Sequence, residues 1–96
     1  MIIYTKESGN ELFGMPKITE YLLIGYDGDE KSSKSYDISL LVVHEWYANS
    51  VGNFFPKKGV PLRKVTKYME KLGYTRVPDD ETEDILQDLE ELYGIK

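Results

Sequence analysis

Four carboxylates near the end of the chain recur at helical spacing, and this pattern predicts a charged binding surface. They are Glu81, Asp84, Asp88 and Glu91, separated by three, four and three residues. On a helix this spacing places one carboxylate on each turn of one side, about 5–6 Å apart. Such a row could contact a basic surface on another molecule. The ordinary structural explanation of the same pattern is the solvated side of a soluble amphipathic helix.

A second charged group consists of bases that surround and occupy a predicted helix near residues 61–72. Its members are Lys57, Lys58, Arg63, Lys64, Lys67 and Lys71, and Arg76 flanks the ridge after the helix. The four on the helix span roughly 100° of the helical wheel, opposite its apolar stripe. A ridge of cations can contact several phosphates. Aromatic side chains that could stack on bases lie nearby in the sequence: Trp46, Tyr47, Phe54 and Phe55. A solvated, lysine-rich helix face explains the same residues without nucleic acid.

The two groups divide the second half of the chain by sign. Residues 57–76 hold seven bases and one acid, whereas residues 77–96 hold eight acids and one base. Either the blocks neutralise each other on folding or they present two charged faces to partners. If the two helices packed face to face, both binding hypotheses would weaken, because an exposed ion pair adds only about 0–1 kcal/mol.

Catalysis, metal binding and cofactor binding have little support in the sequence. His44 is the single histidine and could act as a general base, but no serine or cysteine constellation accompanies it. The chain has no cysteine, which excludes disulfides and thiolate zinc sites. It has no Walker pattern and no dinucleotide fingerprint. We therefore expect no catalytic residue, no metal and no cofactor.

Length and composition predict one domain, residues 1–96, in the soluble cytoplasmic class. Ninety-six residues fit a single domain. The first residues lack the basic start and apolar stretch of a signal peptide. The longest apolar run, Leu40 to Val43, is far shorter than the ~20 residues of a membrane span.

The first half of the chain favours strands. Residues 2–5 and 21–26 are strand candidates, although Pro16 leaves a short helix over 17–26 open. The polar segment 27–35 predicts a surface loop with little reason to order itself. Residues 36–43 alternate like a strand that pairs with 21–26 in a hairpin, followed by a helical turn near 44–51. A helix from Asp37 to Val51 is the alternative, since short apolar runs do not settle the period.

The second half predicts two helices. Pro61 suits a helix start, and one face carries Leu62, Val65, Met69 and Leu72. Gly73 is suited to the position after the end, and Tyr74 can fold back over the last turn. Residues 75–77 are a short strand candidate, and Pro78 interrupts the chain. Asp79 or Asp80 then caps a second helix, which ends at Gly94. Its apolar stripe is Ile85, Leu89, Leu92 and Tyr93. We predict an α+β fold, a small antiparallel sheet packed against these two helices.

Two resemblances accompany these patterns. The segment Pro61–Val77 resembles the recognition helix and following strand of a winged helix-turn-helix domain, which makes that fold the alternative. It departs from the pattern because the long stretch Gly52–Gly59, with Pro56, replaces a short turn after a preceding helix. The acidic row resembles, in class and not in motif, small acidic proteins of mobile elements that mimic DNA and block nucleases or restriction complexes.

These patterns predict a non-catalytic binding protein that acts through charged surface. The first hypothesis is an inhibitor whose acidic helix occupies a basic nucleic-acid channel on a protein partner. The alternative is a nucleic-acid-binding regulator that uses the basic helix 61–72. No membrane partner is expected. The oligomeric state stays open, although the open edge of a small sheet favours dimers.

Overall fold

The chain forms five strands and two helices in the residues that its structure describes. The computed structural model describes residues 1–8, 18–43, 48–54 and 59–93, and for residues 48–54, 92 and 93 it describes the backbone only. The elements are β1 (Ile2–Ser8), β2 (Ile18–Tyr26), β3 (Tyr36–Val43), β4 (Ala48–Phe54), α1 (Leu62–Lys71), β5 (Thr75–Arg76) and α2 (Asp79–Tyr93). The strands form one sheet in the order β4-β3-β2-β1-β5, with antiparallel neighbours throughout. The predicted α+β fold is confirmed.

Both faces of the sheet carry buried apolar side chains. Ile2 and Tyr4 of β1 stand opposite Ile24 and Leu22 of β2, and all four are buried in one cluster. Ile3 lies between them in sequence and therefore points to the other face, where it is also buried. Because both faces carry apolar residues, each face needs a cover.

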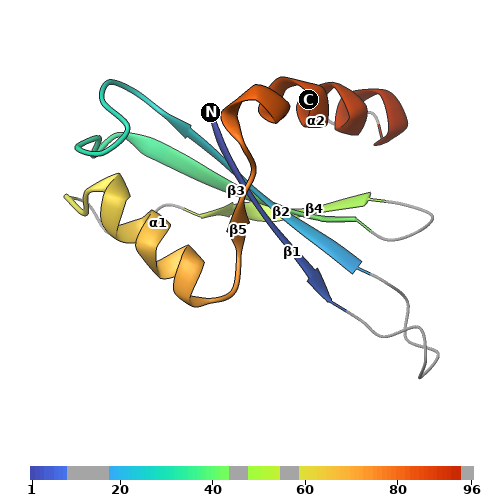
Figure 1. Ribbon diagram of the computed structural model, residues 1–96, viewed down its shortest axis with the longest axis horizontal. Coiled ribbons are helices and arrows are strands. Elements are labelled where there is room, and N and C mark those ends of the chain that lie inside the picture. The colour runs from blue at the N-terminus through green and yellow to red at the C-terminus, as the bar shows by residue number, and fades with distance from the viewer. Residues whose placement is uncertain (9–17, 44–47, 55–58, 94–96) are drawn as a thin grey trace.

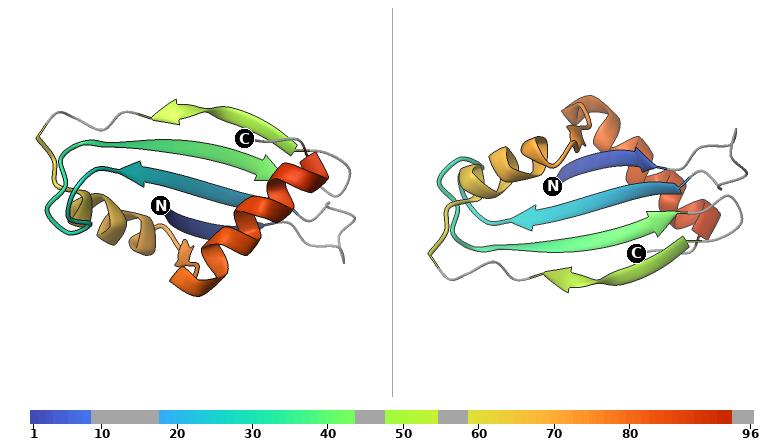
Figure 2. Two further views of the ribbon diagram at one scale, coloured as in Figure 1. Left: turned by 90° about the horizontal axis from the view of Figure 1, so that it is seen from above. Right: turned by 90° about the horizontal axis from the view of Figure 1, so that it is seen from below.

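The two helices lie on opposite faces of the sheet (Figure 1). Leu62 of α1 is fully buried in the cluster that contains Tyr4, Leu22 and Ile38. On the other side α2 contacts β1 and buries Leu89. The views from above and below show α2 crossing one face, whereas α1 runs along the β1–β5 edge of the other (Figure 2). The fold is therefore a helix, a sheet and a second helix in three layers.

Local sequence sets the ends of α1 as expected. Pro61 occupies the position before the first helical residue, with extended backbone angles. Gly73 has a φ of +94°, a left-handed conformation that glycine adopts without steric cost. The amide of Tyr74 returns to donate to the carbonyl of Met69 at 3.1 Å. Lys6 of β1 also donates from Nζ to the carbonyl of Leu72 at 2.9 Å, so a strand residue caps the helix end.

Two of the helical alternatives are wrong, and the hairpin is confirmed. Residues 18–26 form β2 rather than a short helix, and residues 36–43 form β3 rather than the start of a helix. The two strands pair antiparallel, from Tyr26 with Tyr36 to Thr19 with Val43. The predicted helical turn near 44–51 is wrong for residues 48–51, which belong to β4, while 44–47 lie outside the described residues. In the described part of the chain, the element that precedes α1 is the strand β4. The winged helix-turn-helix alternative stays a prediction.

The polar segment 27–35 is ordered, contrary to expectation. The hydroxyl of Ser33 is buried and donates to the carbonyl of Asp27 at 2.7 Å. The amide of Leu62 donates to the carbonyl of Ser33 at 2.8 Å, which joins the loop to the first turn of α1. Buried backbone groups require such partners. The loop therefore helps to position α1, a role that its composition did not indicate.

Candidate functional site

The acidic row lies on the exposed side of α2. Glu81, Asp84, Asp88 and Glu91 are all exposed, while Thr82 and Leu89 on the same helix are buried. Ile85 is half-buried, as the predicted apolar stripe requires, and the side chains of Leu92 and Tyr93 lie outside the described residues. No lysine or arginine occurs within α2. The helix thus presents carboxylates to solvent and apolar groups to the sheet.

The cations of α1 are exposed on the other side of the molecule. Arg63, Lys64, Lys67 and Lys71 each have an exposed side chain. Lys57 and Lys58, which were expected to extend this ridge, lie outside the described residues. Among the residues that the structure describes, no ion pair joins a cation of α1 to an acid of α2. Since the helices occupy opposite faces, the two charge sets do not neutralise each other.

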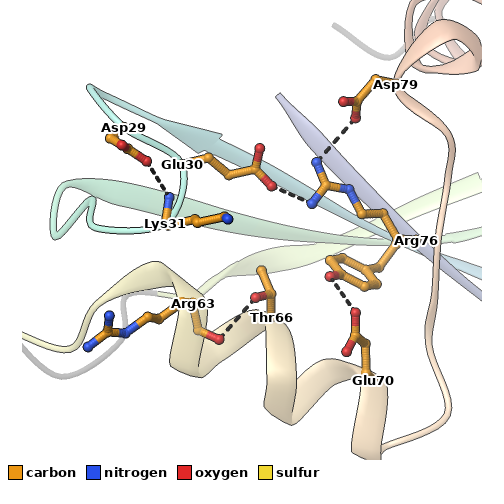
Figure 3. A network of polar contacts seen from close by, with 9 residues as sticks. Asp29, Glu30, Lys31, Arg63, Thr66, Glu70, Arg76 and Asp79 are labelled. Atoms are coloured by element: carbon orange, nitrogen blue, oxygen red, sulfur yellow. Dashed lines mark hydrogen bonds and ion pairs between the residues drawn. The ribbon is translucent and has the colours of Figure 1, made fainter.

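Arg76 is a correction to the expected cationic ridge. It lies on β5 between the helices, half-buried, and forms ion pairs with Glu30 of the loop and Asp79 of α2 (Figure 3). Hydrogen bonding to Glu30 is the main cause that raises the pKa of Arg76, and Asp79 adds to it. Arg76 is therefore a structural link between the loop, β5 and α2, and it is not free for a partner.

A buried tyrosine connects the first strand to α1. The hydroxyl of Tyr4 donates to Oε1 of Glu70 at 3.4 Å, and the ring is almost fully buried. Burial, followed by the negative charge of Glu70, raises the pKa of Tyr4. Glu70 is thereby drawn toward the sheet, which leaves the outer side of α1 to its cations.

An apolar groove between α1 and the sheet was not predicted. It has a volume of about 590 Å³, a floor that includes Leu22, Ile38 and Leu40, and a wall formed by α1. Leu72 was expected in the buried stripe of α1, yet it is 43 % exposed at this groove. α1 lies at the edge of the sheet (Figure 2), and the groove is lined by residues of both α1 and the sheet. Helical periodicity alone gives no signal of it.

Several other predicted features cannot be placed. His44, Trp46, Tyr47 and Phe55 lie outside the described residues, as does the side chain of Phe54. Within the described ranges no group of three or more histidine, cysteine or acidic side chains has the geometry to hold a metal ion. Neither helix in the described part of the chain combines the length and apolarity that a bilayer-spanning helix requires.

Two surfaces therefore stand out in the described part of the chain: the acidic side of α2, and the outer side of α1 with its adjoining groove. Comparison with known proteins found no matching family model, no matching curated protein and no matching solved structure.

Proposed function

We propose that this chain is a non-catalytic binding protein whose acidic helix α2 contacts a basic surface on a partner protein. In its sharpest form, the row Glu81, Asp84, Asp88 and Glu91 imitates the phosphates of a nucleic-acid strand. The protein then occupies the nucleic-acid channel of its target, for example a nuclease complex, and inhibits it.

One observation carries this proposal: the acids of α2 are exposed and are separated from the cations of α1 by the sheet. Had the cations faced them, the acids would have been screened internally. Carboxylates that point into water keep their full attraction for an external basic surface. Long-range attraction of this kind speeds encounter and favours partners of opposite charge.

The test compares capture of partners by the wild-type chain with capture by a charge-reversed variant. In the variant Glu81, Asp84 and Asp88 are each replaced by lysine. Extract of the native host is passed over both immobilised proteins, and the retained proteins are quantified by mass spectrometry. We expect a nucleic-acid-binding protein that the wild-type chain retains and the variant does not. Added wild-type chain should also displace DNA or RNA from that protein.

A matched control separates the row from overall charge. Glu83→Lys with Glu90→Lys changes the net charge as much as Asp84→Lys with Asp88→Lys, on the same helix but outside the row. The control pair should retain the partner and the row pair should lose it. Circular dichroism verifies that each variant is folded. Equal retention by the wild-type chain and the folded triple variant would refute a role for the acidic row.

The alternative function, nucleic-acid binding through α1, rests on four exposed cations: Arg63, Lys64, Lys67 and Lys71. It predicts that the isolated protein binds DNA or RNA directly, with an affinity that falls steeply as salt rises. The capture experiment distinguishes the two functions. A retained protein that nuclease treatment of the extract releases would favour the alternative, whereas nuclease-resistant capture favours direct contact through α2.

A further inference from the structure

The groove beside α1 is open to solvent, and exposed apolar side chains form part of its wall. Tyr68 is 58 % exposed and Leu72 is 43 % exposed, although both are large and largely apolar. They follow each other at i and i+4, so they form one ridge on the side of α1 that faces the groove. Exposed apolar surface of this kind marks interaction sites more often than chance.

Cations border the groove on its outer side. Lys64 belongs to the groove wall itself. It precedes Tyr68 by four residues and Lys71 follows Tyr68 by three, so each lies one helical turn from the exposed ring. Both lysines are exposed, and neither has an acidic partner among the described residues. Lys6, in contrast, is already engaged at the end of α1 by the carbonyl of Leu72.

Two acids of the described chain that lie near the groove, Glu20 and Glu70, face tyrosine side chains. Glu20 lies near Tyr74, where its charge, together with the dominant effect of burial, raises the pKa of that tyrosine. Glu70 faces Tyr4 rather than the groove wall. The open side next to Lys64 and Lys71 is therefore electropositive. An apolar channel with a cationic rim fits an apolar ligand that carries negative charge beside its apolar face.

We propose that this groove docks an amphipathic helix of a partner protein, with apolar residues toward the groove and acidic residues at its flank. A helix fits better than a small molecule, because an open groove leaves much of a small ligand in water, whereas pockets bury 70–90 % of theirs. The ten-residue α1 offers a wall of about 15 Å, which matches about three turns of a bound helix. Successive acids on that helix can meet Lys64 and Lys71, whereas a fatty acid has one carboxylate.

This docking surface is independent of the proposed function of α2. The two surfaces lie on opposite faces of the sheet and share no residue. Substitutions in the groove should leave the capture by α2 unchanged, and substitutions in the acidic row should leave the groove unchanged. The failure of one proposal is thus distinguishable from the failure of the other.

The test uses the full chain and a synthetic model helix of about four turns, labelled with fluorescein. Leucines occupy positions i, i+3, i+4 and i+7 of the peptide, and glutamates occupy both flanks. One comparison peptide has lysines in place of the glutamates, and another has the acidic composition in scrambled order. We expect fluorescence anisotropy to show saturable binding of the acidic helix only. Binding should shift the NMR signals of the methyl groups of Leu22, Leu40 and Met69.

A matched pair of variants locates the contact on α1. Lys64→Glu places its charge reversal at the groove, and the neighbouring Arg63→Glu places the same reversal about 100° away around the helix. We expect Lys64→Glu to weaken binding about fivefold and Arg63→Glu to change it less than about twofold. Tyr68→Ala should weaken binding about tenfold, because it removes an aromatic anchor that the bound helix would cover. All three residues are exposed, so the variants should fold, which circular dichroism verifies.

Three results would overturn the proposal. One is the absence of saturable binding by the acidic helix. Another is equal binding by the scrambled or lysine-flanked peptide. The third is a saturable shift of the groove methyl signals on addition of dodecanoate, while the acidic helix leaves those signals unchanged. That result would identify a site for small apolar anions instead.

Discussion

Asp84 lies at the centre of the acidic row, and replacing it should stabilise the protein. Its neighbours one turn away are Asp80, Glu81 and Asp88, at i−4, i−3 and i+4. All four carboxylates are exposed on one helix, and no base within α2 offsets them. Like charges at these spacings destabilise a helix. The positive end of a helix stabilises acids in its first turn. Asp84 lies beyond the first turn of α2, so it does not gain this stabilisation.

The size of the effect follows from these three neighbours. Each like-charge pair costs about 0.2–0.5 kcal/mol, so Asp84→Asn should raise the free energy of unfolding by roughly 0.6–1.5 kcal/mol at low salt. Full exposure of the row favours the lower end of this range. Asp84→Lys turns repulsion into attraction and should gain up to about twice as much. For a domain of this size, 1 kcal/mol raises Tm by about 4–8 °C.

Urea unfolding at low and high salt measures this prediction, with Ser32→Lys as the control. Ser32 lies exposed in the loop, and Ser32→Lys changes net charge by the same amount as Asp84→Asn. The control should leave stability nearly unchanged. In about 1 M salt, where the screening length is near 3 Å, the gain from Asp84→Asn should largely disappear. If Asp84→Asn leaves stability unchanged or lowers it at low salt, the carboxylates do not repel one another as inferred.

Two further predictions concern the core and the effect of alkali. Leu62→Ala should lower the free energy of unfolding by about 2–5 kcal/mol, because Leu62 is 0 % exposed. Leu72→Ala should lower it by less than half as much in the same urea assay. Equal losses would contradict the packing described. Burial is the main cause that raises the pKa values of Tyr4, Tyr36 and Tyr74 above 10.0. Stability should therefore fall as the pH rises toward 10 and beyond, because the unfolded chain releases these protons first. Tyr4→Phe should make that fall shallower in unfolding curves measured from pH 8 to 11, and an unchanged slope would count against the burial of this hydroxyl.

The two helices could be predicted from the sequence because local signals agree there. Periodic apolar residues lie between Pro61 and Gly73, and Pro78 marks the start of the second helix. The exposure of the charged side chains followed from the same periodicity, and the structure confirms it for α1 and for the acidic row.

The strand after β3 could not be predicted in the same way. Its sequence, Ala-Asn-Ser-Val-Gly-Asn-Phe, contains several residues that are uncommon in strands, and its extended form depends on pairing with β3. Local propensity contains no information about pairing between segments that are distant in the sequence. For this reason the local sequence of residues 48–51 predicts a helical turn, and it leaves a longer helix from Asp37 to Val51 as an alternative.

The arrangement of the two surfaces was also beyond local reasoning. The pairing of Thr75 and Arg76 with β1 carries the chain from one face of the sheet to the other, and this pairing joins residues about 70 positions apart. The groove depends on where α1 lies over the sheet. Neither distance along the chain nor helical periodicity contains that information.

The separation of α1 from α2 by the sheet gives the molecule a permanent electric dipole moment, in addition to its net charge of −5. A body with such a moment rotates in the field of a charged partner before contact is made. A basic surface therefore meets α2 first, and an acidic one meets α1 first, at a frequency above that of random collision. Orientation at a distance is thus a property of the fold itself and requires no contact residue.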